Sequence, residues 1–178
     1  MTDTTSIPET RLDLPGRPTP YVLRKGEGEK SLLFDNAFTM LLSADETEGQ
    51  YSAAILQGGK GDRIPAHLHQ RTHEFFYVIE GAITVWTDDQ EEHHAKTLIE
   101  PGDFAFIPAN IVHAYRVESA TKVFGAGTGD FFRFFRAAGA PTGETGLPHE
   151  VYVPPMEQLI GAGQQYDVHF MPEFQFRD

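Results

Sequence analysis

The sequence predicts an all-β domain, a barrel or sandwich, followed by short C-terminal helices. From residue 21 to about residue 126, short apolar runs alternate with clusters of Gly, Asp, Asn and Pro, as expected for short strands joined by tight turns. Beyond residue 126 the apolar spacing becomes suited to helices. We therefore expect a flexible N-terminal arm over 1–18, a barrel over 19–126, and a C-terminal helical or extended segment over 127–178 that packs on the barrel.

The length and composition of the chain fit one such domain. It has 178 residues, of which 40% are hydrophobic, and this is enough to bury one core. The net charge of −12 argues against nucleic acid or an anionic membrane as a partner, because both would repel the protein. The N-terminus carries no apolar run typical of a signal peptide, and no apolar stretch is long enough to cross a bilayer. We therefore expect a cytoplasmic protein.

Four strands can be placed in the middle of the chain. Aromatic and β-branched residues favour a strand at 75–79, and Glu80-Gly81 predicts a tight turn after it. Pro101-Gly102-Asp103 predicts a second turn, and Pro108 ends the strand that follows that turn. The predicted strands are 75–79, 82–86, 104–108 and 113–117.

Two helices are expected after the barrel. Asp130 can act as an N-cap for a helical turn over 131–136, whose phenylalanines have the spacing of a buried helical face. Pro154-Pro155 is acceptable in the first turn of a second helix.

Three histidines and one glutamate have the spacing of a metal site on strands. His67 and His69 are two residues apart, so their side chains project to the same face while Leu68 points away. Glu74 would reach the same ion from a returning strand, and His113 would reach it from across the sheet. The chain has no cysteine, so the ligands must be nitrogen and oxygen. Three imidazoles and one carboxylate suit a divalent transition metal.

These residues also fit the two sequence motifs of the cupin superfamily. The first motif is matched at every interval, and the second carries Asn110 in place of a glycine and Val117 in place of an asparagine. Asn tolerates the left-handed backbone conformation well, so the first departure is mild. The resemblance implies a single cupin, a small antiparallel β-barrel of the jelly-roll type with the metal inside, and small cupins commonly form homodimers. The matching residues are Gly61, His67, His69, Glu74, Gly81, Gly102, Pro108 and His113.

Most of the chain between residues 20 and 170 resembles the bacterial single-cupin quercetinases. The similar segments are Pro20–Leu23, Pro65–His69 and Phe131–Phe135. This resemblance implies a quercetin 2,3-dioxygenase (flavonol 2,4-dioxygenase) that opens the heterocyclic ring of a flavonol with dioxygen, and releases carbon monoxide and a depside. The implied cofactor is one divalent metal ion; nickel is favoured, with cobalt, manganese, iron or copper as alternatives.

On this hypothesis Glu74 is both a metal ligand and the general base that removes the proton of the flavonol 3-hydroxyl group. His67, His69 and His113 hold the ion. An aromatic cavity would bind a flat substrate and exclude water. We expect Phe76, Phe106 and Met156 to contact the substrate.

Three other functions remain open from the sequence. A different cupin dioxygenase acting on another aromatic or enol substrate would use the same ligands. A non-redox isomerase or decarboxylase would work without oxygen and would need a more basic pocket than the sequence indicates. A non-catalytic cupin would bind a small molecule without turnover; such modules commonly accompany a DNA-binding segment, and no basic helix-turn-helix pattern precedes this barrel.

Overall fold

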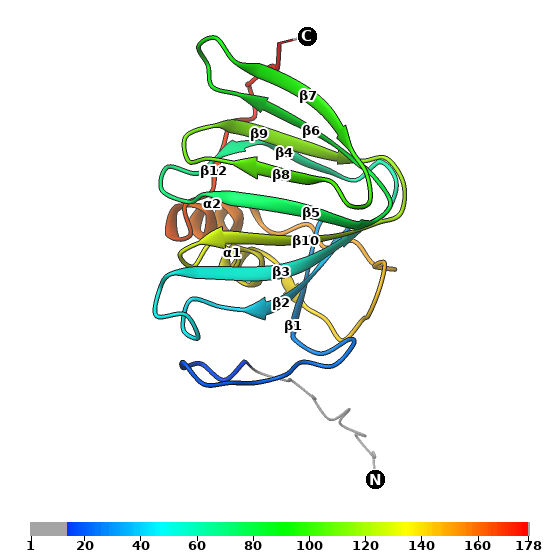
Figure 1. The fold of residues 1–178 in the computed structure, drawn as a ribbon, viewed down its shortest axis with the longest axis vertical. Helices are drawn as coiled ribbons and strands as arrows, with labels where there is room; N and C mark the ends of the chain where they lie inside the picture. Colours follow the sequence, from blue (N-terminus) through cyan, green and yellow to red (C-terminus); the bar gives the residue numbers. More distant parts are fainter. Residues whose placement is uncertain (1–13, 178) are drawn as a thin grey trace.

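The computed structural model describes residues 14–177, and most of the predicted N-terminal arm lies outside the described residues. Two antiparallel β-sheets form the body of this part of the chain, and two helices pack beside the strands (Figure 1). Most strands pair with partners from distant parts of the sequence, as in β10 with β3 and β4 with β9. The predicted all-β fold with short C-terminal helices is confirmed.

The larger sheet has seven strands in the order β11-β1-β2-β3-β10-β5-β8. Their bounds are β1 Glu29–Leu33, β2 Asn36–Leu42, β3 Tyr51–Gly58, β5 Glu74–Glu80, β8 Phe104–Ile107, β10 Thr121–Thr128 and β11 Ala140–Pro141. The smaller sheet has five strands in the order β12-β4-β9-β6-β7. Their bounds are β4 Arg63–Leu68, β6 Ile83–Asp88, β7 His94–Ile99, β9 Val112–Val117 and β12 His169–Phe170.

Side-chain alternation along the strands places one apolar face of each sheet in the core. On β5, Phe76 and Val78 are buried, whereas their neighbour Tyr77 is exposed. The predicted strands and turns of the middle segment are confirmed, with Gly81 and Gly102 both at positive φ (74° and 97°) in the two expected turns. The core therefore lies between the sheets, around the site described below. Core residues from both sheets include Phe38, Leu56, Phe76, Val78, Ile83, Val85, Tyr115, Val117 and Val123.

The first helix differs from the prediction. Helix α1 spans Arg133–Ala138 and has no side-chain cap, so the prediction of Asp130 as an N-cap was wrong. The carboxylate of Asp130 instead accepts a hydrogen bond from the Ala44 N–H group (3.4 Å) and pairs with Arg133 (3.1 Å). Phe131 precedes the helix, and its ring lies in the core.

The second helix follows the prediction. Helix α2 spans Met156–Gln165 and begins directly after Pro155. Within residues 14–177, no helix combines the length and the apolar character that crossing a membrane requires.

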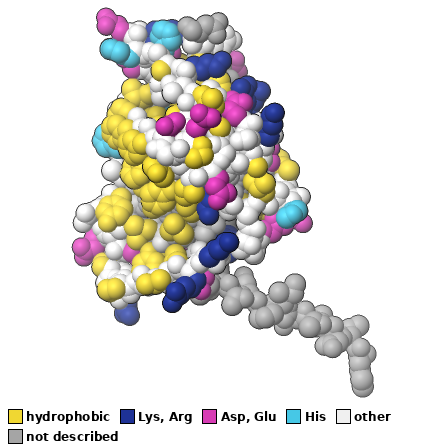
Figure 2. Space-filling model, turned by 45° about the vertical axis from the view of Figure 1, so that its right-hand side comes forward, with side chains coloured by type: hydrophobic (Ala, Val, Ile, Leu, Met, Phe, Trp, Pro, Cys, Tyr) yellow, Lys and Arg dark blue, Asp and Glu magenta, His cyan; other side chains and the backbone are white. Residues whose placement is uncertain are grey.

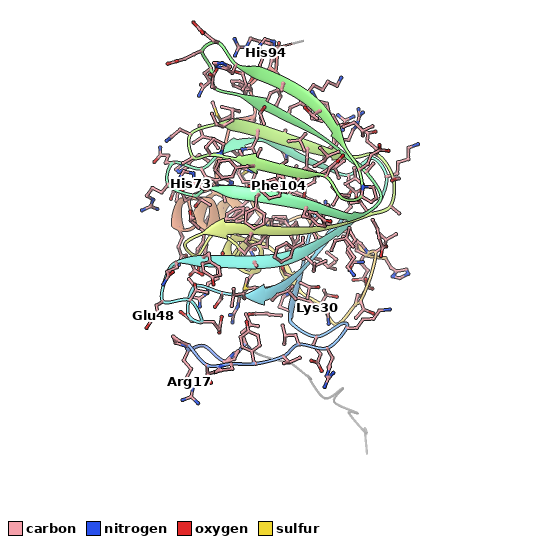
Figure 3. The ribbon with its side chains drawn as sticks, in the orientation of Figure 1. Arg17, Lys30, Glu48, His73, His94 and Phe104 are labelled. Carbon is pink, nitrogen blue, oxygen red and sulfur yellow. The ribbon has the colours of Figure 1, made fainter. Side chains whose placement is uncertain are left out.

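The outer face of the larger sheet carries several exposed aromatic side chains. Tyr77 on β5 pairs with Phe104 on β8, and Phe75 pairs with Phe106 in the same way. Figure 2 shows hydrophobic side chains gathered over the middle of one face of the molecule, and Phe104 is labelled in Figure 3. Exposed apolar side chains that gather in this way are typical of surfaces that contact another molecule.

Candidate metal centre

The four predicted ligands converge inside the barrel. His67 on β4 is the direct cross-strand partner of His113 on β9, while His69 follows the end of β4 and Glu74 begins β5. All four side chains are buried. One ligand atom from each residue lies within 4.8 Å of all the others. The structure thus brings together the four side chains that strand alternation placed in one site.

Each histidine uses its Nδ1 atom to bind a backbone carbonyl group. The acceptors are Pro65 O for His67 (2.8 Å), Asp167 O for His69 (2.7 Å) and Ile111 O for His113 (3.0 Å). A carbonyl oxygen can only accept, so Nδ1 must carry the hydrogen in all three rings. The Nε2 lone pair of each neutral ring is then available to a metal, which is the arrangement usual in metal-binding histidines.

The donor set fits a cation. Nε2 of His113 lies 3.2 Å from Oε2 of Glu74, and Nε2 of His69 lies 3.3 Å from the same oxygen. His69 Nε2 has no geometrically acceptable hydrogen-bond partner although it is fully buried. Unshared lone pairs and a carboxylate facing one another away from water would be costly unless a positive charge lies between them. Three imidazole nitrogens and one carboxylate oxygen are the ligands expected for a divalent transition metal.

The electrostatics of the site favour a neutral His67 and an ionised Glu74, whereas at His69 burial is outweighed by the contact with Glu74, which raises the pKa. Burial, reinforced by the neighbouring His113 and His69, lowers the pKa of His67 well below its usual range, so that ring is neutral. Burial alone would raise the pKa of Glu74, but its close contacts with His113 and His69 outweigh burial and hold the pKa at about 2. Glu74 is therefore an ionised carboxylate at neutral pH.

Asn110 adopts the left-handed backbone conformation (φ 68°) where cupin motifs carry glycine, as the sequence predicts. Its backbone N–H group donates to the carbonyl of His69 at 2.7 Å. The turn before β9 is thereby fixed against the segment that carries the histidine pair.

A small cavity of about 30 Å³ adjoins His67 and Glu74. Its lining is mostly apolar, and the hydroxyl group of Tyr115 in its wall is buried without a hydrogen-bond partner among the described residues. Burial raises the pKa of Tyr115 well above its usual range, and Glu74 reinforces this, so the hydroxyl group keeps its proton. Aromatic residues in the lining are Phe38, Phe76, Phe131, Phe132 and Phe135.

The structure brings only one of the three predicted substrate residues to this cavity. Phe76 lines it. Phe106 is 55% exposed, because the neighbouring Ile107 takes the inward position on β8. Met156 is 68% exposed at the start of α2. Neither Phe106 nor Met156 lines the cavity as it stands.

Comparison with protein families matches residues 56–124 to the cupin domain. Among solved structures, the chain is similar to KdgF from a Halomonas species (TM-score 0.52, 16% identity, 62% of this chain and 94% of that one). It is similarly close to an RmlC-like cupin from Shewanella frigidimarina (TM-score 0.53, 18% identity, 62% of this chain and 92% of that one). The chain belongs to the cupin superfamily.

Two curated relatives of this cupin are named quercetin 2,3-dioxygenase. The protein from Bacillus subtilis is 41% identical over 131 residues, which are 72% of this chain and 37% of that protein. The protein from Aspergillus japonicus is 24% identical over 174 residues, which are 88% of this chain and 49% of that protein. This cupin thus spans between a third and a half of the length of the curated relatives it matches.

Sequence analysis of this cupin missed Asp167, which supports the metal centre from the C-terminal segment. Besides the His69 contact of its carbonyl, its carboxylate accepts hydrogen bonds from the N–H groups of Gln70, Arg71 and Thr72 (3.1, 2.8 and 3.0 Å). Burial would raise the pKa of Asp167, but these N–H groups outweigh it and keep the carboxylate ionised. Asp167 has a positive φ of 63°. No local signal in the sequence indicates a contact between positions almost one hundred residues apart.

Proposed function

We propose that this cupin is a metal-dependent dioxygenase that opens the heterocyclic ring of a flavonol such as quercetin. In this reaction both atoms of dioxygen enter the organic product, one carbon leaves as carbon monoxide, and a depside remains. The observation that carries the proposal is the buried convergence of His67, His69, Glu74 and His113 in a chain 41% identical to a quercetin 2,3-dioxygenase.

The metal ligands proposed are these same four residues. A bound divalent ion would act as a Lewis acid that stabilises the oxyanion of the deprotonated flavonol hydroxyl group. The affinity order of nitrogen and oxygen sites favours copper and nickel over iron and manganese, and of these two we propose nickel, as the resemblance to the quercetinases implies. Reconstitution of metal-free protein with nickel, cobalt, manganese, iron and copper in turn, followed by elemental analysis and turnover measurements, tests this choice.

Glu74 is proposed as the base that receives the proton of the 3-hydroxyl group. Its carboxylate is buried beside the apolar cavity, so a proton can pass to it where bulk water does not compete. The three histidines cannot serve as easily, because their Nδ1 atoms are bonded to carbonyl groups and their Nε2 lone pairs would be used by the metal. Glu74 would therefore both bind the metal and accept the proton.

Tyr115 and Phe76 are the proposed substrate contacts in the cavity. The Tyr115 hydroxyl group is a protonated donor without a partner, so it can donate to a carbonyl or hydroxyl oxygen of a flavonol. Phe76 offers a flat apolar surface on the same wall. Both would bind and orient the substrate, while the surrounding aromatic side chains exclude water.

The experiment that tests this function uses metal-loaded protein, quercetin and air. We expect loss of the near-ultraviolet absorption band of quercetin together with release of carbon monoxide, and no such change without oxygen. If absorbance is stable in air and no carbon monoxide forms with any of the five metals, the dioxygenase proposal is wrong.

We further propose that the protein is a cytoplasmic homodimer. The exposed Tyr77, Phe104 and Phe106 supply apolar surface of the kind found at subunit contacts. Sedimentation of the purified protein tests the dimer, and fractionation of cells tests the location. A monomer over the whole concentration range would exclude the dimer.

A further inference from the structure

A second, larger cleft has Phe131 in its lining, as the small cavity does. It has a volume of about 380 Å³, and its walls come from the loop before β3, the segment before β5, the end of β10 and the end of α2. Phe131 lines both this cleft and the small cavity beside His67 and Glu74, and no other residue is common to the two linings. Phe131 therefore lies where the two linings meet, and we call its side chain the partition.

The partition is held in place by packing. Phe131 is 3% exposed, and its ring meets the ring of His69 edge to face with centroids 4.4 Å apart. Gly127 allows this position, because a Cβ atom there would lie only 2.9 Å from Cδ1 of Phe131. Movement of this one ring would join the cleft to the metal centre.

The small cavity cannot hold a substrate of the proposed kind, so substrate binding requires a connection to a larger space. A volume of about 30 Å³ is close to that of one water molecule in the liquid, whereas ligand sites commonly have volumes of roughly 300–1,000 Å³. The outer cleft falls within this range. A flat molecule with two ring systems would thus have to place one ring system in the cleft when the other approaches the metal.

The cleft also offers hydrogen-bond donors that the protein does not use. Within residues 14–177, the guanidinium group of Arg71 has no ion pair and the side chain of Gln50 has no hydrogen bond. The hydroxyl group of Tyr166 accepts from Nε2 of Gln165 at 3.1 Å, so its own hydrogen remains available. Donors of this kind suit the oxygen atoms of a polyphenol, and the charge of Arg71 suits a phenolate.

We propose that this cleft is the outer subsite of the substrate pocket and binds the hydroxylated ring of a polyphenol. The Phe131 side chain then moves aside when the reacting ring of the substrate passes toward the metal centre. The identity of the substrate in this proposal rests on the proposed function; the connection between the two spaces rests on the geometry of Phe131 alone.

Binding of quercetin without oxygen tests the subsite. Titration of metal-loaded protein under nitrogen, followed by the absorption change of quercetin, should show affinity about tenfold lower for Arg71→Ala, as expected for loss of a hydrogen bond to a charged group. Arg63→Ala is the matched control, because Arg63 is exposed, has no ion pair among the described residues and lines neither space. Equal affinities for Arg71→Ala and Arg63→Ala would overturn the subsite.

Removal of Co²⁺ by the chelator dipicolinate tests the partition without any turnover. Phe131→Ala should speed removal about tenfold or more, which corresponds to a barrier lower by about 1.4 kcal/mol. Phe132→Ala is the control, because Phe132 is equally buried and lines the small cavity but not the cleft. Equal acceleration in both variants, or none in Phe131→Ala, would overturn the role of Phe131.

The outcomes separate this inference from the proposed function. Quercetin binding that depends on Arg71, with no turnover in air, would refute the dioxygenase and retain the subsite. Turnover that is indifferent to Arg71 would retain the dioxygenase and refute the subsite. Absence of any quercetin binding would refute both.

Discussion

The backbone carbonyl of Asp167 accepts a hydrogen bond from Nδ1 of His69, with the two atoms 2.7 Å apart and the two residues 98 positions apart in sequence. The contact fixes the tautomer of a proposed metal ligand. The side chain of Asp167 fixes the segment that follows His69 as well. The C-terminal segment is therefore part of the metal centre and not merely a cover for the barrel.

Asp167→Ala should weaken metal binding by about 10–100-fold, the usual effect of losing a group that orients a ligand. The variant keeps the carbonyl group but loses the carboxylate that holds residues 70–72, so His69 is less well positioned. Competition with a chelating dye measures the affinity. Asp167→Asn is the control, because it keeps an acceptor oxygen and tolerates the positive φ. An unchanged affinity in Asp167→Ala would contradict the role assigned to the carboxylate.

His113→Ala should leave the purified protein with little metal. The substitution removes one of four ligands from a buried site, and the three remaining groups bind a divalent ion less tightly. Elemental analysis of metal per chain is the measurement. His94→Ala is the control, because His94 is exposed on β7 at one end of the molecule (Figure 3) and is not one of the four converging side chains. Full metal content in His113→Ala would exclude His113 as a ligand.

Glu74→Gln should lower kcat by about 100-fold or more, the usual effect of losing a positioned base. The amide has nearly the same shape as the carboxylate but accepts a proton poorly, so the three histidines can still hold metal. Turnover per bound metal ion separates loss of the base from loss of the ion. Nearly full turnover per metal ion in Glu74→Gln would rule out Glu74 as the base.

Tyr115→Phe should change stability and binding in opposite directions. Loss of a buried hydroxyl group that has no partner should leave the free energy of unfolding unchanged or raise it by about 1 kcal/mol. The affinity for quercetin without oxygen should fall about five- to tenfold, because the proposed donor is gone. Urea denaturation and the anaerobic titration are the two measurements. Undiminished affinity would mean that Tyr115 serves only the core.

The raised pKa of Asp62 should lower the free energy of unfolding as the pH rises through weakly acidic values. Burial and a hydrogen bond shared with Asp35 raise the pKa of Asp62 from its usual 3.8 to about 6. The folded state therefore binds this proton more tightly than the unfolded state. The resulting stability is fully present below pH 3.8 and is lost as the pH rises through about 6.

Asp62→Asn tests this dependence, because the amide can donate to Asp35 and accept from the Gly59 N–H group as protonated Asp62 does. At pH 7 the variant should be more stable than the natural protein by roughly 1–2 kcal/mol, and at pH 4 the difference should be small. Denaturation at the two pH values measures this. The same difference at both would show that titration of Asp62 is not its cause.

The metal ligands could be predicted from sequence because their spacing is local and strands alternate strictly. His67 and His69 must share a face. The expected hairpin is absent, because Glu74 begins β5 in the other sheet, but its side chain still reaches the site. The strands of the middle segment were predictable for the same reason, since their turns carry glycine where φ is positive. Local rules therefore supplied the candidate ligands of the site and the positions of its strands along the chain.

The residues that sequence analysis placed wrongly depend on packing between distant segments. Phe104 and Phe106 alternate with Ala105 and Ile107, and apolar character alone does not reveal which pair faces the core. Asp130 has the composition of an N-cap, but an ion pair with Arg133 and a contact to a remote loop hold it elsewhere. Asp167 acts through a carbonyl group that every residue possesses.

The direct pairing of His67 with His113 ties metal uptake to the last stages of folding. The hairpin of β6 and β7 can form from neighbouring sequence, but β4 meets β9 only after the chain between them has closed into the barrel. A shift of one residue in that pairing would turn one imidazole outward. A partly folded chain therefore has no complete binding site, and bound metal reports that the native strand register has been reached.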